Sequence, residues 1–306
     1  MAETTISVII CAHTMERHFD LRAAVQSVHA QDRPADEIVV VIDHNEELLT
    51  AVADLEARVI PNTGPKGLSG ARNTGTWAAT SDVVAYLDDD ATAAPDWLAH
   101  LAAPFVDPAV VAVGGWANPN WDTEPPGWFP DEFAWVIGCS HRGLPTELTE
   151  VRNVIGCNMA FRRSAVIDAE GFTTTLGRTA DRPLGCEETE LCIRIRQSDP
   201  GARILLEPRA TVSHRVPAGR ARWQYFAQRC RAEGNSKAHV AKMVGSDDAL
   251  SSERDYVRRV LPRAFVSAAR SVPSEPVDSV LRMAALGGGL AITAGGYVEY
   301  AMLRRS

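Results

Sequence analysis

Three consecutive aspartates, Asp88, Asp89 and Asp90, directly follow the apolar run 83–87 of this 306-residue sequence. Such a run predicts a buried strand, so the carboxylates should stand at its carboxyl end. Adjacent carboxylates repel one another unless a cation compensates their charge, and a hard divalent ion bound to a diphosphate is a natural partner. The alternative is a solvated loop in which an aspartate caps the next helix. We favour the cation site.

Two further sets of residues have side chains that a reaction at a bound metal ion would need. Glu187 and Glu188 open an acidic segment at an expected helix start, where capping and the helix dipole are a sufficient structural explanation. A positioned carboxylate is also what a reaction at a hydroxyl needs as its general base. His214 follows a strand-like run, and it is either a ligand for an ion such as Mn²⁺ or a structural histidine.

The segment 62–73 has the parts of an anion-binding loop. It combines several glycines, the cation Lys66 and an expected helix start just before Arg72 and Asn73. Backbone amides and a helix N-terminus favour an anionic ligand, although Gly-Lys-Ser/Thr of the Walker motif is absent. The alternative is an ordinary flexible loop.

These residues need a scaffold that brings them together. Apolar runs alternate with helix-period segments in the first third of the chain, at residues 6–11, 38–42, 58–60 and 83–87. This alternation predicts an α/β fold with a mostly parallel central sheet flanked by helices. Ligands bind beyond the carboxyl ends of the strands in such sheets, so Ala12, His13, Asp43 and the aspartates should converge on one crevice.

Composition narrows the class of protein. A hydrophobic content of 45% supports a large core, and a net charge of −8 with a pI of about 5.5 argues against general attraction to nucleic acid. Six scattered cysteines without CxxC pairs predict reduced thiols in a cytoplasmic protein. We expect no signal peptide at the N-terminus.

The middle of the chain contains aromatic and basic residues that suit the binding of another ligand. Trp128 and Trp135 belong to a segment rich in Trp, Pro and Gly, which can stack on sugars or dock a lipid carrier, or equally form a small satellite core. Arg178 and Arg182 precede the acidic segment and suit a carboxylate or phosphate, the alternative being solvated loop charges.

The C-terminal part predicts helices. Its many arginines form a locally basic region that can attract anionic lipid or a phospholipid-linked acceptor. Residues 283–303 have about the length of a bilayer span, but five glycines and Glu299 favour a packed or interfacial helix in contact with a membrane surface or another copy.

Together these motifs resemble family 2 glycosyltransferases of the nucleotide-binding GT-A fold, over roughly residues 6–237. Asp88 and Asp90 match the family's Asp-X-Asp motif. The usual Glu-Asp catalytic motif is replaced by Glu187-Glu188, which puts the base on Glu188 and leaves Glu187 as a competitor. The segments 43–45 and 128–130 resemble bacterial and archaeal members labelled glucosyl-dolichyl-phosphate glucuronosyltransferases.

The resemblance implies three sets of site residues. The donor would be bound by Ala12, His13, Asp43, Lys66, Arg72, Asn73, Asp88 and Asp89. Asp90 and His214 would hold Mn²⁺ or Mg²⁺. The acceptor would meet Trp128, Trp135, Asn158, Arg178 and Arg182.

The resemblance also implies an organisation and an activity. Residues 1–237 would form the GT-A domain, with nucleotide-binding and acceptor halves at 1–115 and 116–237, and 238–306 a helical extension. The chain would transfer a sugar, with inversion, from a nucleoside-diphosphate sugar to a hydroxyl of a saccharide or lipid-linked saccharide, in the cytoplasm or at the inner face of the membrane. The alternatives are an inactive nucleotide-sugar binding module and a sugar-phosphate nucleotidyltransferase.

Overall fold

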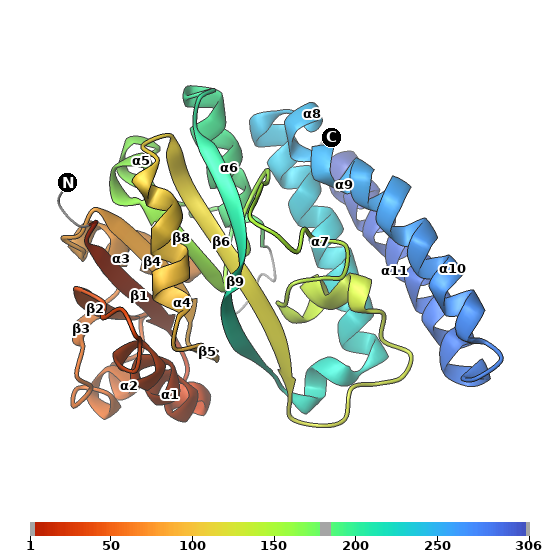
Figure 1. Ribbon diagram of the computed structural model, residues 1–306, viewed down its shortest axis with the longest axis horizontal. Helices are drawn as coiled ribbons and strands as arrows, with labels where there is room; N and C mark the ends of the chain where they lie inside the picture. Colours follow the sequence, from red (N-terminus) through yellow and green to blue (C-terminus); the bar gives the residue numbers. More distant parts are fainter. Residues whose placement is uncertain (1–3, 178–184, 304–306) are drawn as a thin grey trace. The chain divides into compact units, whose positions relative to one another are not determined.

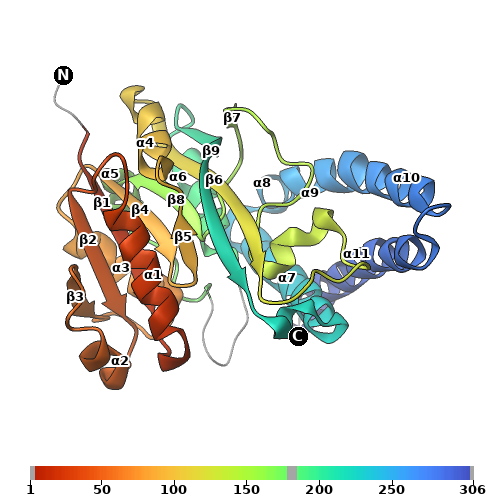
Figure 2. The same cartoon turned by 60° about the horizontal axis from the view of Figure 1, so that its bottom comes forward.

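The computed structural model describes residues 4–177 and 185–303 (Figure 1, and Figure 2 in a second view). The described residues form a sheet ordered β3–β2–β1–β4–β8–β6–β9–β5, with β7 paired to β9. The strands are β1 (Ile6–Ala12), β2 (Glu37–Ile42), β3 (Arg58–Pro61), β4 (Val83–Asp88), β5 (Ala91–Ala93), β6 (Val110–Trp121), β7 (Thr149–Glu150), β8 (Asn158–Arg162) and β9 (Arg203–Val216).

The chain divides into two compact units. Unit 1 comprises residues 4–118, 145–177 and 187–214 of the described chain, and unit 2 comprises 119–144, 185–186 and 215–303. The expected boundary at residue 237 falls inside helix α7 (Trp223–Val244), because this helix continues without a break across that position.

Unit 1 carries most of the sheet together with its own set of helices. They are η1 (Met15–Arg17), α1 (His18–His29), α2 (Glu46–Ala51), α3 (Leu68–Ala78), α4 (Trp97–Ala102), η2 (Ala103–Val106), α5 (Arg163–Asp168) and α6 (Glu187–Ser198). The first four strands in sheet order pair in parallel, whereas β8 pairs antiparallel with both β4 and β6, and β9 pairs antiparallel with β5 and β7. The expected α/β class is confirmed, and the sheet is mixed, with its parallel part in the N-terminal half.

The strand register explains where polar residues gather. In the parallel pairs, Ala12 lies opposite Ile42 and Cys11 lies opposite Asp88. Each of these strands ends within a residue of the others, so Asp43 and the aspartate turn after β4 stand at the same edge of the sheet. The β5–β9 pairing places Ala91 opposite His214 and so brings the histidine beside this turn.

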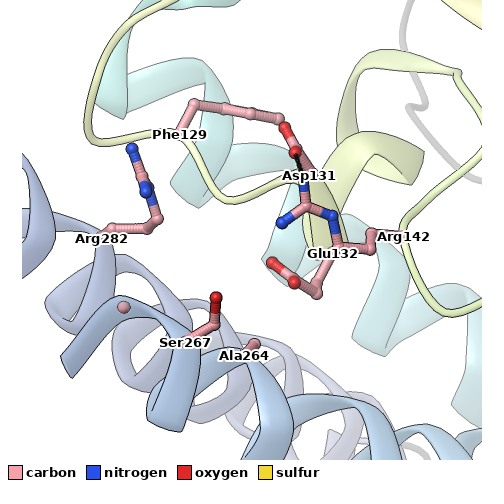
Figure 3. A pocket seen from close by; sticks show the side chains of 8 residues that line it. Phe129, Asp131, Glu132, Arg142, Ala264, Ser267 and Arg282 are labelled. Atoms are coloured by element: carbon pink, nitrogen blue, oxygen red, sulfur yellow. Dashed lines mark hydrogen bonds and ion pairs between the residues drawn. The ribbon is translucent and has the colours of Figure 1, made fainter. Parts of the chain in front are cut away.

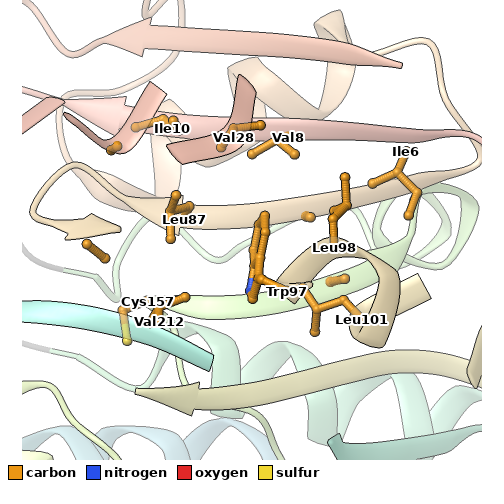
Figure 4. Close-up of a cluster of buried hydrophobic side chains, with 14 of the residues drawn as sticks. Ile6, Val8, Ile10, Val28, Leu87, Trp97, Leu98, Leu101, Cys157 and Val212 are labelled. Atoms are coloured by element: carbon orange, nitrogen blue, oxygen red, sulfur yellow. The ribbon is translucent and has the colours of Figure 1, made fainter. Parts of the chain in front are cut away.

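The sheet has an apolar layer on each face. Successive side chains of β1 alternate between them, with Val8 and Ile10 in one cluster and Ile9 in the other. Figure 4 shows the first cluster, where Trp97 and Leu98 of α4 pack beneath the strands. Burial on both faces is typical of parallel strands.

Unit 2 is mainly helical. Its helices are η3 (Asp131–Ile137), η4 (Ala218–Ala221), α7, α8 (Ser246–Ala249), α9 (Ser251–Asp255), the π-helical turn η5 (Tyr256–Val260), α10 (Leu261–Ser271) and α11 (Pro276–Leu303). A Cβ on Gly234 of α7 would lie 2.0 Å from the carbonyl oxygen of Thr293, so α7 and α11 approach backbone to backbone. Residues 276–302 are long and apolar enough to cross a membrane, by length and composition alone.

The segment 62–73 depends on one glycine. A Cβ on Gly70 would lie 1.9 Å from the carbonyl oxygen of Pro65, which is backbone and cannot move without the loop. We predict that Gly70→Ala lowers the free energy of unfolding by about 1–3 kcal/mol, measured by urea denaturation. Gly219→Ala is the matched control, because nothing lies within 4 Å of its Cβ position. Equal stability of the two variants would contradict the close packing of this loop.

Candidate active site

Asp88, Asp90 and His214 form a cluster able to hold a metal ion. One ligand atom from each lies within 4.8 Å of the others. The Nε2 atom of His214 is 3.2 Å from Oδ1 of Asp90 and 4.0 Å from Oδ2 of Asp88. Asp90 and His214 are buried, whereas the side chain of Asp88 is 29% exposed. Two carboxylates and an imidazole suit Mn²⁺, and they accommodate Mg²⁺ with the remaining ligands taken from water or phosphate.

Arg17 compensates part of this negative charge. Its Nη1 atom lies 2.9 Å from Oδ1 of Asp89 and 3.1 Å from Oδ2 of Asp90. Burial, helped by the neighbouring carboxylates Asp90 and Asp88, raises the pKa of Asp89 to about 7 against the opposing effect of Arg17. The sequence interpretation missed Arg17, although a cation a few residues beyond β1 is where a counter-ion for the aspartate turn would be expected.

Arg72 links the aspartate turn to the acidic helix α6. The guanidinium is buried, with Nη1 donating to Oε1 of Glu187 at 2.8 Å and Nη2 donating to the carbonyl oxygen of Gly156 at 2.7 Å. Nη2 also lies 3.4 Å from Oδ1 of Asp88. The rings of Tyr86 and Phe172 lie 6.0 and 5.6 Å from its Cζ atom. Arg72 is therefore a fixed cation inside unit 1, in direct contact with the proposed site.

The two adjacent glutamates of α6 lie in different environments. Glu187 is 4% exposed and occupied by the ion pair with Arg72, whereas Glu188 is only partly buried. A Cβ added to Gly156 would lie 3.7 Å from Oε2 of Glu188 and 3.2 Å from Nη2 of Arg72. Glu188 thus borders the same network as Asp88 while keeping access to solvent.

Asp43 organises the loop that follows β3. Its Oδ1 accepts from Nδ2 of Asn62 at 2.6 Å, and its Oδ2 accepts from the backbone amide of Gly67 at 2.9 Å. His44, with φ of 52°, contacts the same carboxylate through Nδ1 at 2.9 Å. Lys66 projects from this loop and is exposed, as is His13 beyond β1. Ala12 is buried at the end of β1.

Two predicted substrate contacts are occupied by the fold itself. Asn158 is 0% exposed, and its amide bonds to Trp97 Nε1, to the carbonyl of Ala210 and to that of Trp116, so it is not available to an acceptor. Asn73, which is partly buried, both donates to and accepts from the backbone of Phe172. Both side chains have partners within the fold, which sequence position does not reveal, and their roles as ligand contacts stay predictions.

The predicted aromatic contacts lie in unit 2. Trp128 and Trp135 are half-buried at the edge of an apolar cluster that includes Phe133 and Phe226, and Trp128 meets Phe226 edge to face. They form a satellite core, and the partly exposed rings leave an acceptor role as a prediction. Arg178 and Arg182 lie outside the described residues.

Unit 2 also contains a small cavity of about 120 Å³ (Figure 3). Arg142 is paired with Asp131 across it, and Arg282, also on its lining, donates to the carbonyl oxygen of Gly127. Both guanidinium groups of the lining therefore already have a partner within unit 2.

Comparison with known proteins decides the family. A model described as glycosyl transferase family 2 matches residues 7–169, more than half of the chain. This chain belongs to glycosyltransferase family 2. It is 37% identical over 238 residues to the glucosyl-dolichyl phosphate glucuronosyltransferase of Haloferax volcanii, covering 76% of each chain. The expected resemblance and the expected glycosyltransferase enzyme are both confirmed.

Other relatives of this family 2 glycosyltransferase are more distant. It is 27% identical over 212 residues to the succinoglycan biosynthesis protein ExoM of Rhizobium meliloti, covering 66% of this chain and 64% of the relative. It is 30% identical over 184 residues to the pre-mycofactocin glycosyltransferase of Mycobacterium tuberculosis, covering 58% and 37%.

Solved structures confirm the GT-A fold of this glycosyltransferase. A mannosyltransferase from Pyrobaculum calidifontis in complex with GDP-Man and Mn²⁺ superposes with a TM-score of 0.59 at 17% identity, covering 99% of this chain and 89% of that one. GalNAc-T7 with UDP, GalNAc and Mn²⁺ gives a TM-score of 0.53 at 21% identity, covering 75% and 47%. At these identities the similarity establishes the fold alone.

The burial of Arg72 predicts a large effect on stability. Arg72→Leu leaves the buried carboxylate of Glu187 without its counter-charge, which should lower the free energy of unfolding by about 3–5 kcal/mol in urea denaturation. Arg58→Leu is the matched control, because Arg58 pairs with Glu37 at the surface and such pairs contribute about 0–1 kcal/mol. A loss for Arg72→Leu no greater than for the control would contradict the buried ion pair.

Proposed function

We propose that this chain is an inverting, metal-dependent glycosyltransferase that moves a sugar from a nucleoside-diphosphate donor to a hydroxyl acceptor. The observation that carries the proposal is the cluster of Asp88, Asp90 and His214, joined through Arg72 to the helix that bears Glu188. A metal site and a solvent-accessible carboxylate on one network are the two parts that such a transfer needs.

A few residues would share the binding of the sugar donor and its metal ion. Asp90 and His214 would hold Mn²⁺ or Mg²⁺, and Asp88 would lie between the metal and the nucleoside. The bound metal supplies compensation for the charge that develops on the departing nucleoside diphosphate. Arg17 and Arg72 hold the carboxylates in place while they are crowded together. Asp43 and Lys66 would meet the nucleotide from the neighbouring loop.

Glu188 would act at the acceptor end. It would accept the proton of the attacking hydroxyl as the new bond forms on the face of the sugar opposite the leaving group. A single displacement of this kind inverts the anomeric centre. Glu187 is the weaker candidate because it is buried and its charge is engaged by Arg72, so its proposed task is to fix the start of α6.

The acceptor and the location follow from the relatives. The Haloferax volcanii relative is named for a lipid-linked sugar acceptor, which supports a saccharide or lipid-linked saccharide as the acceptor here, with Trp128 and Trp135 as candidate contacts. Such an acceptor would place the enzyme at the cytoplasmic face of a membrane. An inactive binding module is disfavoured because the metal ligands and the base are all present together.

Asp90 gives the first test of the donor site. In a thermal-shift screen of UDP, GDP and dTDP sugars, we predict stabilisation by one nucleotide class that requires Mn²⁺, and Asp90→Asn should abolish the metal-dependent part by removing a ligand. Asp131→Asn in unit 2 is the control and should respond as the wild type does. Metal-dependent stabilisation that persists in Asp90→Asn would refute the assignment.

Glu188 gives the test of the base. Glu188→Gln should lower kcat by about 10²- to 10⁴-fold, the usual loss for a general base, while the Mn²⁺-dependent nucleotide shift stays as in the wild type. The anomeric configuration of the product, followed by NMR, should be opposite to that of the donor. Turnover close to normal in Glu188→Gln, or a product of retained configuration, would contradict the proposed mechanism.

A further inference from the structure

Helix α11 presents an apolar stripe that nothing in the described chain covers. Every exposed residue from Val280 to Met302 is apolar: Val280, Leu281, Ala284, Ala291, Ala294, Gly295, Val298, Ala301 and Met302. The larger side chains are strongly exposed, with Val280 at 53%, Leu281 at 47% and Met302 at 67%. At 1.5 Å per residue the stripe is about 33 Å long, far more than scattered surface hydrophobics on a soluble protein.

The charged side chains of the described part of α11 are turned away from this stripe. Glu299 forms a bidentate ion pair with Arg231 of α7, at 2.6 and 2.9 Å. Arg282 donates to the carbonyl oxygen of Gly127, and the carboxylate of Asp278 packs against the same glycine. The helix is therefore amphipathic within unit 2, with its polar contacts on the protein side.

The packing of α11 argues against a span across a bilayer. A Cβ on Gly234 would meet the carbonyl oxygen of Thr293, and a Cβ on Gly296 would lie 2.3 Å from that of Arg231, so α11 is seated directly on α7. Helix α7 carries Arg229, Arg231 and Lys237 along its length. A span would carry these charges into hydrocarbon, which is costly. The stripe suits the surface of a bilayer instead.

The charge on the neighbouring helices indicates which kind of surface the stripe of α11 would contact. Residues 251–271 contain five arginines and two acidic residues in a chain whose net charge is −8. Arg258, Arg263 and Arg270 are exposed and have no ion pair within the described chain. Helix α10 packs on α11, with Phe265 against Gly287. The exposed residues of α11 between Val280 and Met302 offer no acidic side chain to these arginines in a second copy, whereas anionic lipid headgroups would attract them.

We propose that the exposed stripe of α11 inserts into the interfacial region of an anionic lipid bilayer, with the arginines of 251–271 directed toward the headgroups. An amphipathic helix of this kind binds through buried apolar area and through electrostatic attraction to anionic lipid. The surface belongs to unit 2 and does not depend on the proposed reaction, whose donor residues lie in unit 1.

The test is flotation of the full chain with phosphatidylcholine vesicles that contain or lack phosphatidylglycerol. We expect the wild type to float with the anionic vesicles. In the double variant Leu281→Glu, Val298→Glu, the vesicle partition coefficient should fall at least about tenfold for each substituted side chain. Val106→Glu, at a 70% exposed position of unit 1, is the control and should float as the wild type does. Arg263→Glu with Arg270→Glu should remove the preference for anionic vesicles.

Three outcomes would overturn the proposal. The first is that the wild type floats with neither kind of vesicle. The second is that the Leu281→Glu, Val298→Glu variant floats as well as the wild type. The third is that the wild type is a dimer, and that this variant is a monomer whose vesicle binding is unchanged. The last result would make the stripe an interface between copies. The Mn²⁺-dependent nucleotide shift, measured on the same variants, reports unit 1 and separates this failure from failure of the proposed reaction.

Discussion

The concentration of negative charge at the end of β4 is the constraint on which the rest of the site depends. Asp89 and Asp90 are nearly buried, and buried carboxylates are unstable without compensating positive charge. The fold provides positive charge from two separate elements, with Arg17 from η1 and Arg72 from α3, and it places His214 of β9 beside Asp90 as a candidate metal ligand. A divalent cation bound by Asp88, Asp90 and His214 would complete the compensation, as the proposed function requires.

This requirement also explains the connection between the aspartate turn and helix α6. Arg72 alone cannot neutralise Asp88, because Arg72 is buried and already paired with Glu187. The resulting chain of contacts fixes the first turn of α6 relative to the aspartate turn, within unit 1. Gly156 leaves room for Arg72, since a Cβ there would lie 3.2 Å from its Nη2 atom, and Oε2 of Glu188 would lie at ordinary contact distance from the same Cβ.

Much of this arrangement was predictable from sequence, for a physical reason. Parallel strands that alternate with helices bring their carboxyl ends to one edge, so Asp43, Asp88 and Asp90 could be placed together without coordinates. The roles of Arg72, Asn73 and Asn158 could not, because each depends on the direction of a side chain from its helix or strand. The choice between Glu187 and Glu188 had the same limit: neighbours on a helix point about 100° apart, and only the structure shows which one faces the interior.

The most direct test of the account is anomalous diffraction at the manganese edge from crystals grown with Mn²⁺ and the nucleoside diphosphate that stabilises the protein. The account predicts one strong peak within bonding distance of Asp90 and His214, beside Asp88, and its loss in His214→Ala crystals. A manganese site elsewhere in the chain, or a nucleotide bound beside this cluster with no metal between them, would contradict it.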